Sequence, residues 1–444
     1  MTSPRRTSRR CFLKTSALVT ATVAAPAFVR GRNLNSKLQL AGIGTEGKGW
    51  SDIRQMASHP QVKFVAFCDV DLSRTDKVRG LAPEAPVFQD YRIMLDRLGD
   101  RIDAVTVSTP DHTHALISMD AMRRGKHVYC QKPLTHTVFE SRQMRLQAAK
   151  SGVITRMGNQ IHSHTAYRTA VQLIQSGAIG KVKAVHSWVS TTGHGYSGLL
   201  NRPAKSARVP NSLNWDLWIG GAPMRPYGGY RVYHPFTWRD WQDFGSGASG
   251  DFGCHLLDPV YTALKITGDP ISVVAEHTGM NDEVWPAQGT LQYVIPGTEY
   301  TAGKTLPIHW YNGGLRPNRA IAKLALGQSL PRSGSIFVGR SANLILPHVA
   351  APYLNKPDFK IDAEKSFNHY HGWVDGCLLA KQPSDSFEYG GHLTEAVLLG
   401  NVAAYFPKEK LEFDGKALKI TNKPAANPYL TRQYRNGFEI EPVS

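Results

Sequence analysis

The sequence has few cysteines, few charged residues and no uncharged apolar run of membrane-spanning length. Its five cysteines show neither a Cys-x-x-Cys pair nor a Cys/His zinc spacing, which excludes a disulfide-stapled mini-protein and a zinc ribbon. The longest uncharged stretch is too short and too weakly apolar to cross a bilayer. With 444 residues, of which 41% are apolar, the chain predicts at least two globular domains.

The net charge of +17 shows only that the protein does not repel anions, and it does not by itself identify a partner. Seven of the excess positive charges lie in the first 32 residues, where there is no acidic residue. The remaining charge is spread along the chain without a Lys/Arg run. A basic patch or stripe is what nucleic-acid binding requires, so we predict no nucleic-acid partner.

The basic N-terminal segment, residues 1–32, has the organisation of an export signal. An arginine pair at 9–10 is followed by Phe-Leu-Lys, an uncharged stretch covers 15–29, and small residues at 25–27 offer a cleavage site. The segment resembles a twin-arginine (Tat) signal. This predicts an exported, periplasmic protein that meets the Tat machinery after folding, with free thiols and its cofactor already bound. The alternative is a basic tail on a cytosolic protein.

Strands and helices alternate from residue 33 to residue 157. Short apolar runs at 37–42, 62–68, 87–88, 104–108, 128–130 and 153–157 predict strands, and the segments 50–58, 91–98, 114–124 and 137–151 between them predict helices. This alternation is typical of a parallel, doubly wound sheet, and we predict a Rossmann domain over 33–157.

The pattern changes in residues 158–444. Strands are expected at 182–190, 272–279, 290–295, 307–311 and 335–346, and helices at 362–379 and 392–404. This predicts an α+β domain with a large, mainly antiparallel open sheet. An insertion at about 191–248 is rich in Gly, Pro and aromatic residues. Five of the nine tryptophans lie between residues 188 and 241, so this region is unlike a floppy linker.

A glycine-rich turn follows the first predicted strand. Gly42-x-Gly44-x-x-Gly47 supplies a tight turn, close approach to a pyrophosphate and helix packing, and the helix N-terminus then faces the phosphates. Asp69 lies 22 residues beyond Gly47, at the end of the next strand, where it would accept hydrogen bonds from the adenosine ribose. A carboxylate there repels a 2′-phosphate, so NAD is favoured over NADP. The loop residues Thr45 and Glu46 complete the predicted contact set.

Four further motifs are more specific than the glycine turn. They are the segments 109–114 (Thr-Pro-Asp-His-Thr-His), 125–133 (ending in Gln-Lys-Pro), 180–182 (Gly-Lys-Val) and 250–258 (Gly-Asp-Phe-Gly-Cys-His-Leu-Leu-Asp). Together they resemble the Gfo/Idh/MocA family of glucose–fructose oxidoreductases and inositol dehydrogenases, from about residue 37 to the C-terminus. The resemblance implies an NAD(P)-dependent oxidoreductase whose open sheet pairs with another subunit, giving a homodimer or homotetramer.

The family pattern also implies cofactor contacts, and this chain departs from it at one position. The carried-over contacts are Thr109, Pro110, His114, Gln131 and Lys132. The family usually has Glu-Lys-Pro where this chain has Gln131-Lys132-Pro133. The amide removes a negative charge beside Lys132, so we expect a lower lysine pKa or an altered cofactor contact.

Hydride transfer from a carbinol carbon leaves a hydroxyl proton, which needs a base within hydrogen-bond reach. The resemblance places Lys132 at the nicotinamide end and makes Asp251 and His255 the family's Asp-x-x-x-His motif. Their spacing puts both on one helix face. We assign His255 as general base, Lys132 as hydrogen-bond donor and proton relay, and Asp251 as orienter of substrate hydroxyls. The base and relay roles could be exchanged.

Substrate contacts are expected where a pocket opens after the last Rossmann strand. The candidates are Asn159, His162, Arg168 and Trp238, the last as a flat apolar face for a sugar ring. No metal site is predicted, because the pairs His162/His164 and His255/Asp258 lack a third ligand at fixed spacing.

Three functions remain open from the sequence. The first is an exported NAD-dependent oxidoreductase that moves hydride between a tightly held nicotinamide and a sugar, polyol or glycoside hydroxyl. The second is an NAD-dependent glycosidase or lyase that works by transient oxidation. The third is a non-catalytic binding protein that keeps the Rossmann domain for stability.

Overall fold

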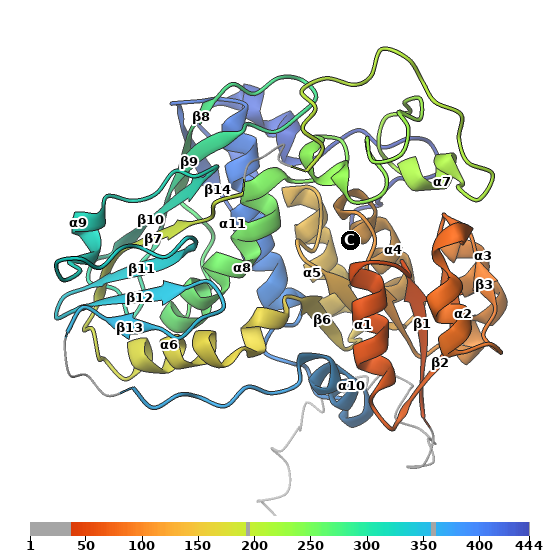
Figure 1. The fold of residues 1–444 in the computed structure, drawn as a ribbon, viewed down its shortest axis with the longest axis horizontal. Helices are drawn as coiled ribbons and strands as arrows, with labels where there is room; N and C mark the ends of the chain where they lie inside the picture. Colours follow the sequence, from red (N-terminus) through yellow and green to blue (C-terminus); the bar gives the residue numbers. More distant parts are fainter. Residues whose placement is uncertain (1–36, 192–195, 357–360, 444) are drawn as a thin grey trace, which may run out of the picture.

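The computed structural model describes residues 37–191, 196–356 and 361–443 (Figure 1). The predicted signal segment lies outside the described residues, and so does Cys11. The other four cysteines are buried free thiols. None of the helices in the described ranges combines the length and apolarity that a membrane crossing requires.

The first domain is a six-stranded parallel sheet in the order β3-β2-β1-β4-β5-β6. Its strands are β1 (Leu38–Ile43), β2 (Val62–Cys68), β3 (Val87–Phe88), β4 (Ala104–Val107), β5 (His127–Gln131) and β6 (Thr155–Gly158). Its helices are α1 (Lys48–Ala57), α2 (Asp76–Leu81), α3 (Tyr91–Leu98), α4 (Asp111–Arg123) and α5 (Val138–Ser151), with short 3-10 turns η2 (Leu72–Arg74) and η3 (Gly99–Arg101). The central strands are buried because helices cover both faces. The predicted doubly wound Rossmann sheet is confirmed.

Local signals in the sequence set where the helices of this domain begin and end. Helix α5 starts at a capping box, in which Thr137 and Glu140 satisfy each other's backbone N–H groups, and it ends at Gly152 in the left-handed conformation. Helix α4 begins at Asp111, three residues before the predicted start. Pro110 is extended, and an acidic residue in the first turn favours a helix start.

The second domain contains a nine-stranded sheet in the order β13-β12-β11-β7-β10-β9-β8-β14-β15. The strands are β7 (Val182–Trp188), β8 (Ser272–Thr278), β9 (Gln288–Pro296), β10 (Thr305–Asn312), β11 (Gly334–Gly339), β12 (Asn343–Pro347), β13 (Tyr353–Leu354), β14 (Lys410–Asp414) and β15 (Lys419–Ile420). Only the β7–β10 pair among these strands is parallel, so the predicted mainly antiparallel sheet is confirmed. The expected single strand at 335–346 is wrong, because a turn after Gly339 makes it a hairpin of β11 and β12.

Helices α8 and α11 lie between the two sheets (Figure 1). The helices of this part are α6 (Thr165–Gln175), α7 (Trp215–Ile219), α8 (Gly247–Leu264), α9 (Arg319–Ala322), α10 (His369–Leu379) and α11 (Phe387–Ala404), with 3-10 turns η4 (Gln160–Ser163), η5 (Thr237–Asp240) and η6 (Pro424–Leu430). The helix expected from 362 begins only at His369, where the Asn368 side chain caps it. Helix α11 starts five residues earlier than expected.

The Trp-rich insertion has a hydrophobic cluster of its own and is fastened to the Rossmann domain. Trp215, Trp218 and Trp241 are among its buried side chains. The backbone N–H of Leu72 donates to the Ser212 carbonyl at 2.9 Å, and the strand-end residues Asp71 and Leu213 form an isolated bridge. The insertion therefore covers the carboxyl ends of the Rossmann strands, where a doubly wound sheet binds its ligand.

Candidate functional site

One cavity of about 410 Å³ joins the glycine turn to helix α8. It opens at the carboxyl ends of β1, β2, β4 and β5 and is closed on the far side by the insertion. The residues predicted from sequence that line it are Gly44, Thr45, Glu46, Gly47, Asp69, Thr109, Pro110, His114, Gln131, Lys132, Trp238, Asp251 and His255. The predicted residues that are not among its lining are Gly42, Asn159, His162 and Arg168.

The glycines leave room for a phosphate at the start of α1. A β-carbon on Gly44 would lie 2.5 Å from the Ser108 carbonyl oxygen, so only glycine fits this close approach of two strand ends. Gly47 has φ of 60° and open space around its missing β-carbon, on the cavity side. Gly49 was missed by sequence reasoning, although a β-carbon there would meet the Gly44 carbonyl at 2.1 Å. This cradle fits a dinucleotide pyrophosphate.

Asp69 joins the end of β2 to the glycine turn. Its Oδ2 accepts hydrogen bonds from the Thr45 backbone N–H at 2.9 Å and the Thr45 hydroxyl at 3.1 Å. Its Oδ1 accepts one from the Asp71 backbone N–H at 3.0 Å and keeps accepting capacity in the cavity. This carboxylate suits the adenosine ribose hydroxyls of NAD.

The adenosine end of the cavity is enclosed by segments far away in the sequence. Leu217 and Trp218 of α7 line it, together with Phe438 of the C-terminal segment. The Phe438 ring is stacked under the Arg92 guanidinium, 4.9 Å away. Sequence reasoning did not find these contacts, because no local pattern marks a residue that closes a pocket from another domain.

The amide of Gln131 is explained by a carboxylate from another element. Gln131 Nε2 donates to Oδ2 of Asp52 at 2.7 Å, and the Ser108 hydroxyl donates to the same oxygen at 2.8 Å. Oδ1 of Asp52, which is fully buried, accepts from Lys48 Nζ at 2.5 Å. A glutamate at 131 would place two carboxylates against each other. The carboxylate beside residue 131 is therefore supplied by Asp52 of α1.

His114 braces the two loops of the nicotinamide side. Its Nδ1 lies 2.8 Å from the Pro133 carbonyl and its Nε2 lies 2.8 Å from the Thr109 carbonyl. Carbonyl oxygens only accept, so both ring nitrogens donate and the ring is cationic. Burial alone would lower the pKa of His114, but Cys130 and the two carbonyls raise it. His114 positions the lining rather than reacting.

Lys132 and Asp251 form an ion pair at the other end of the cavity. Lys132 Nζ donates to Asp251 Oδ1 and to the Asp251 carbonyl, both at 2.6 Å. An ammonium has three N–H donors, so one remains for a ligand oxygen. Burial alone would raise the pKa of the Asp251 carboxyl, but Lys132 and then Arg239 hold it well below its ordinary value. Asp251 is therefore an anion at all working pH values.

The His255 ring has one defined tautomer. Asn159 Nδ2 donates to the Cys254 carbonyl at 3.0 Å, which turns Oδ1 of the same amide toward His255. His255 Nδ1 lies 2.6 Å from that oxygen and must donate to it, because an amide oxygen only accepts. Nε2 therefore carries the lone pair. Burial, followed by the Lys132 charge, lowers the pKa of His255 well below its ordinary value, so the ring is neutral.

Three cavity residues near this end were not found from the sequence. The Tyr196 hydroxyl donates to Asp251 Oδ2 at 3.0 Å, and Arg239 Nε lies 3.7 Å from the same oxygen. Asp111 Oδ2 accepts from the Ser246 hydroxyl at 2.7 Å, and burial together with the Asp251 charge raises the pKa of Asp111 to about 7. Tyr196 and Arg239 belong to the insertion, whose aromatic richness was the available signal.

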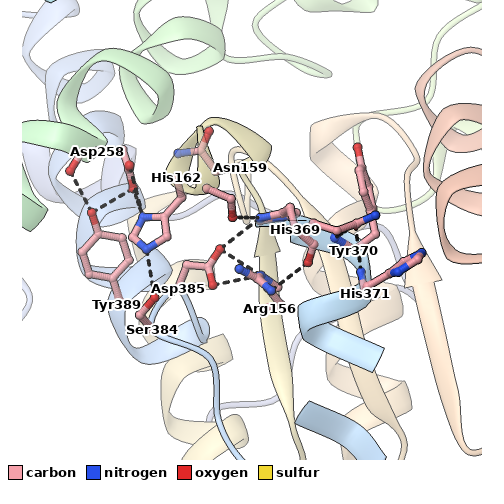
Figure 2. A network of polar contacts seen from close by, with 12 residues as sticks. Arg156, Asn159, His162, Asp258, His369, Tyr370, His371, Ser384, Asp385 and Tyr389 are labelled. Carbon is pink, nitrogen blue, oxygen red and sulfur yellow. Dashed lines mark hydrogen bonds and ion pairs between the residues drawn. The ribbon is translucent and has the colours of Figure 1, made fainter. Parts of the chain in front are cut away.

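His162 lies behind the cavity wall, in a polar network (Figure 2). Its Nδ1 is 2.9 Å from Asp258 Oδ1, and its Nε2 is 3.0 Å from the Ser384 hydroxyl. These spacings match a Ser-His-Asp triad. Burial alone would lower the pKa of His162, but Asp258 raises it to about 9. The ring is protonated at neutral pH and cannot take a proton from Ser384, so the network holds η4 to α8.

Arg168 contacts residues outside the cavity. It lies on α6, where its Nε donates to the Lys365 carbonyl at 2.8 Å and its guanidinium pairs with Glu364 at 3.3 Å. Arg168 is not among the residues that line the cavity, so these contacts do not support its expected substrate role, which stays a prediction. His162 and Asn159 contact Asp258 and His255 and are not among the lining residues, so their expected substrate contacts also stay predictions.

The described ranges bring together no group of three His, Cys, Asp or Glu side chains that could hold a metal ion. The two pairs considered from the sequence are explained otherwise. His162 and Asp258 bond each other, and His255 bonds Asn159.

Family models match both halves of the chain. Residues 38–159 match the model described as an oxidoreductase family with an NAD-binding Rossmann fold, and residues 164–294 match the C-terminal alpha/beta domain of the same family. The chain belongs to the Gfo/Idh/MocA family of oxidoreductases. The family resemblance read from the four motifs is confirmed, and so is the NAD-binding nature of the first domain.

Curated relatives match parts of this family member. It is 32% identical over 115 residues to a 1,5-anhydro-D-fructose reductase of Ensifer adhaerens, over 25% of this chain and 34% of the relative. It is 28% identical over 203 residues to an alpha-N-acetylgalactosaminidase of Shewanella oneidensis, over 39% of this chain and 44% of the relative. The chain thus spans less than half the length of these two relatives.

Solved structures support the fold. The WlbA dehydrogenase of Bordetella pertussis, crystallised with NADH and UDP-GlcNAcA, superposes with a TM-score of 0.60 at 15% identity, over 85% of this chain and 99% of that one. At this identity the likeness concerns the fold, in which a Rossmann domain is followed by a large open sheet.

Proposed function

We propose that this family member is an exported NAD-dependent oxidoreductase that moves hydride between a tightly held nicotinamide and a sugar, polyol or glycoside hydroxyl. The observation that carries the proposal is the fixed tautomer of His255, a residue that lines the same cavity as the glycine turn and whose Nε2 carries the lone pair. The twin-arginine pattern of the first 32 residues supports export through the Tat machinery. The open second sheet supports a homodimer or homotetramer.

The residues divide the work at the reacting oxygen. Bound NAD supplies a nicotinamide carbon that accepts or returns the hydride. His255 Nε2 takes the hydroxyl proton, because the ring is neutral and its Nδ1 proton is committed to Asn159. The third N–H of Lys132 donates to the reacting oxygen, and Asp251 fixes the direction of that ammonium. The enclosed adenosine end supports a cofactor that stays bound through many turnovers.

The test starts from the bound cofactor. Full-length protein is purified, unfolded, and the released nucleotide identified by mass and absorbance. We expect NAD or NADH in near-equal amount to protein, and absorbance changes of the bound nicotinamide when sugars and polyols are added. Protein that carries no dinucleotide and binds none would contradict the proposal. If Lys132→Ala and His255→Ala leave every activity unchanged, the chain is a binding protein.

A glycosidase that works by transient oxidation is the second candidate. The similarity to an alpha-N-acetylgalactosaminidase favours it, and the same proton acceptor could serve an elimination from the carbon beside the oxidised one. Release of aglycone from aryl glycosides without net formation of NADH would identify this activity. Net accumulation of NADH with one equivalent of sugar would identify the oxidoreductase.

A further inference from the structure

Phe236 holds a backbone conformation that a large side chain rarely adopts. Its φ is 75° and its ψ is −43°, in a region where the β-carbon is crowded. Its ring is 47% exposed and lines the cavity. The ring meets that of Tyr196 edge to face, with 5.1 Å between the centroids, and both residues line the cavity. Strained residues of this kind cluster at ligand sites.

The guanidinium of Arg239 lies against two aromatic rings beside this loop. It is 4.5 Å from the centroid of Phe236 and 4.2 Å from that of Trp238. Arg239 Nη1 donates to the Phe236 carbonyl at 2.9 Å, which fixes the plane of the guanidinium. Within the described ranges, no hydrogen bond is made by Nη2. The side chain therefore has a fixed direction and donor capacity left over.

The charge at this end of the cavity is positive. Lys132 and Arg239 share one carboxylate, Asp251, which lies 2.6 Å from the ammonium and 3.7 Å from the guanidinium. The second carboxyl nearby, Asp111, has a pKa raised to about 7 by burial and by Asp251, so it is only partly ionised near neutral pH. Two cations thus face one fully ionised carboxylate.

We propose that Phe236, Trp238 and Arg239 form a subsite for the carboxylate of a sugar acid, a uronic or aldonic acid whose hydroxyl is presented to His255. The proposal rests on the proposed function and names its substrate class. The apolar face of the sugar stacks on the Phe236 ring, and the carboxylate accepts two hydrogen bonds from Arg239. An excess of at most one positive charge fits a carboxylate monoanion better than a phosphate dianion.

The subsite is anchored by the core of the insertion. Trp238 is 8% exposed and Trp241, at the end of η5, is fully buried. The Asp240 carboxylate accepts the backbone N–H of Ser197 at 2.6 Å and that of Tyr196 at 3.1 Å. The loop that carries Phe236 and Arg239 is therefore held on both sides, and its geometry exists before a ligand arrives. Such preorganisation lowers the entropy cost of binding.

The test compares matched acidic and neutral ligands on NAD-loaded protein. Binding of glucuronate against glucose, and of gluconate against glucitol, is measured by calorimetry. We expect the acids to bind about 10- to 100-fold more tightly, as charge-assisted hydrogen bonds require. Arg239→Gln removes that preference, so that each acid binds no more tightly than its neutral counterpart, whereas Arg208→Gln, which removes an exposed arginine outside the cavity lining, leaves the preference unchanged.

A second variant tests the strain. Phe236→Gly relieves the backbone, since glycine adopts positive φ freely. We expect a higher melting temperature together with weaker binding of the acids. Phe236→Ala keeps the backbone conformation and should weaken binding without raising the melting temperature. A melting temperature that falls in Phe236→Gly, with affinity unchanged, overturns the role of this loop.

The outcomes separate the subsite from the proposed reaction. Acids that bind through Arg239 without any change in the bound nicotinamide leave the subsite standing and contradict the redox function. Neutral sugars that are oxidised as well as the acids, with Arg239→Gln unchanged in KM, leave the function standing and overturn the subsite. Equal affinity for sugar phosphates and sugar acids also overturns the assignment to a carboxylate.

Discussion

Two histidines bridge the same two elements from opposite directions. His255 belongs to α8 and bonds the Asn159 amide, which immediately precedes η4. His162 belongs to η4 and bonds the Asp258 carboxylate, three residues beyond His255 on α8. His255 lines the cavity, whereas His162 is not among the lining residues and lies in the polar network of Figure 2. The partner of Nδ1 is an amide in one region and a carboxylate in the other, and the Lys132 charge lies near His255.

The different surroundings of the two rings give His255 and His162 different protonation states. Burial lowers the pKa of both rings, and Lys132 lowers that of His255 further. Asp258 reverses the effect for His162 and raises its pKa to about 9. The cavity side therefore holds a neutral proton acceptor, and the wall behind it holds a ring that is cationic at neutral pH. The groups that surround each ring therefore decide which histidine can accept a proton and which one supports the fold.

The largest effect should follow removal of the cavity-side ring. His255→Ala is expected to lower turnover by about 10²- to 10⁴-fold, the usual contribution of a positioned general base. Its melting temperature should stay near that of the wild type, because the side chain is half-buried at the cavity. Turnover of the bound nicotinamide with its best sugar substrate measures the loss. A loss below threefold would contradict the role of His255 as proton acceptor.

Removal of the ion pair behind the cavity wall should lower stability. Asp258→Ala removes the carboxylate that raises the pKa of His162, so the ring loses both its proton and its ion pair, which is expected to cost about 2–3 kcal/mol in the free energy of unfolding near pH 7. Urea denaturation measures it. Ser384→Ala is the matched control, because it removes only an exposed hydroxyl from the other side of the same ring and should cost less than about 1 kcal/mol. Equal effects of the two variants would contradict the ion pair.

The two rings should also give stability opposite pH dependences. The pKa of folded His162, about 9, lies above the unfolded value near 6.5, so its contribution is complete below about pH 6.5 and is lost as pH rises through 9. The loss is about 3 kcal/mol by linkage. The pKa of folded His255 is depressed, so stability falls as pH drops below about 6.5. Unfolding free energies of wild type and His162→Gln should converge at high pH; parallel curves would refute this.

Replacing the amide partner of His255 by a carboxylate should give this ring a pKa more like that of His162. Asn159→Asp places a carboxylate on Nδ1 of His255 and is expected to raise its pKa, so that the acidic limb of the pH–rate profile moves up by at least about one unit. Asn159→Ala removes the partner without adding charge and should lower turnover without that shift. An unmoved acidic limb in Asn159→Asp would show that the amide does not set the protonation of His255.

Contiguous motifs made much of this molecule readable from its sequence. The glycine turn, Asp69 and the Asp-x-x-x-His spacing each lie within one strand–turn–helix unit or one helix, so periodicity and spacing place them. Spacing located Arg168 and His162 less well, since neither of them lines the cavity. Both follow β6, but the directions of α6 and η4 depend on packing against the second sheet, which no local pattern records.

The sequence by itself determined the alternating Rossmann unit, the mainly antiparallel second sheet and the nucleotide turn, because backbone geometry at these places follows from neighbouring residues. Tertiary structure alone decided which side chains share the reaction end. Asn159, Tyr196 and Arg239 meet His255 and Asp251 there from three separate segments. The protonation state of each group depends on burial and on charges a few ångströms away in space, and those distances exist only after the chain has folded.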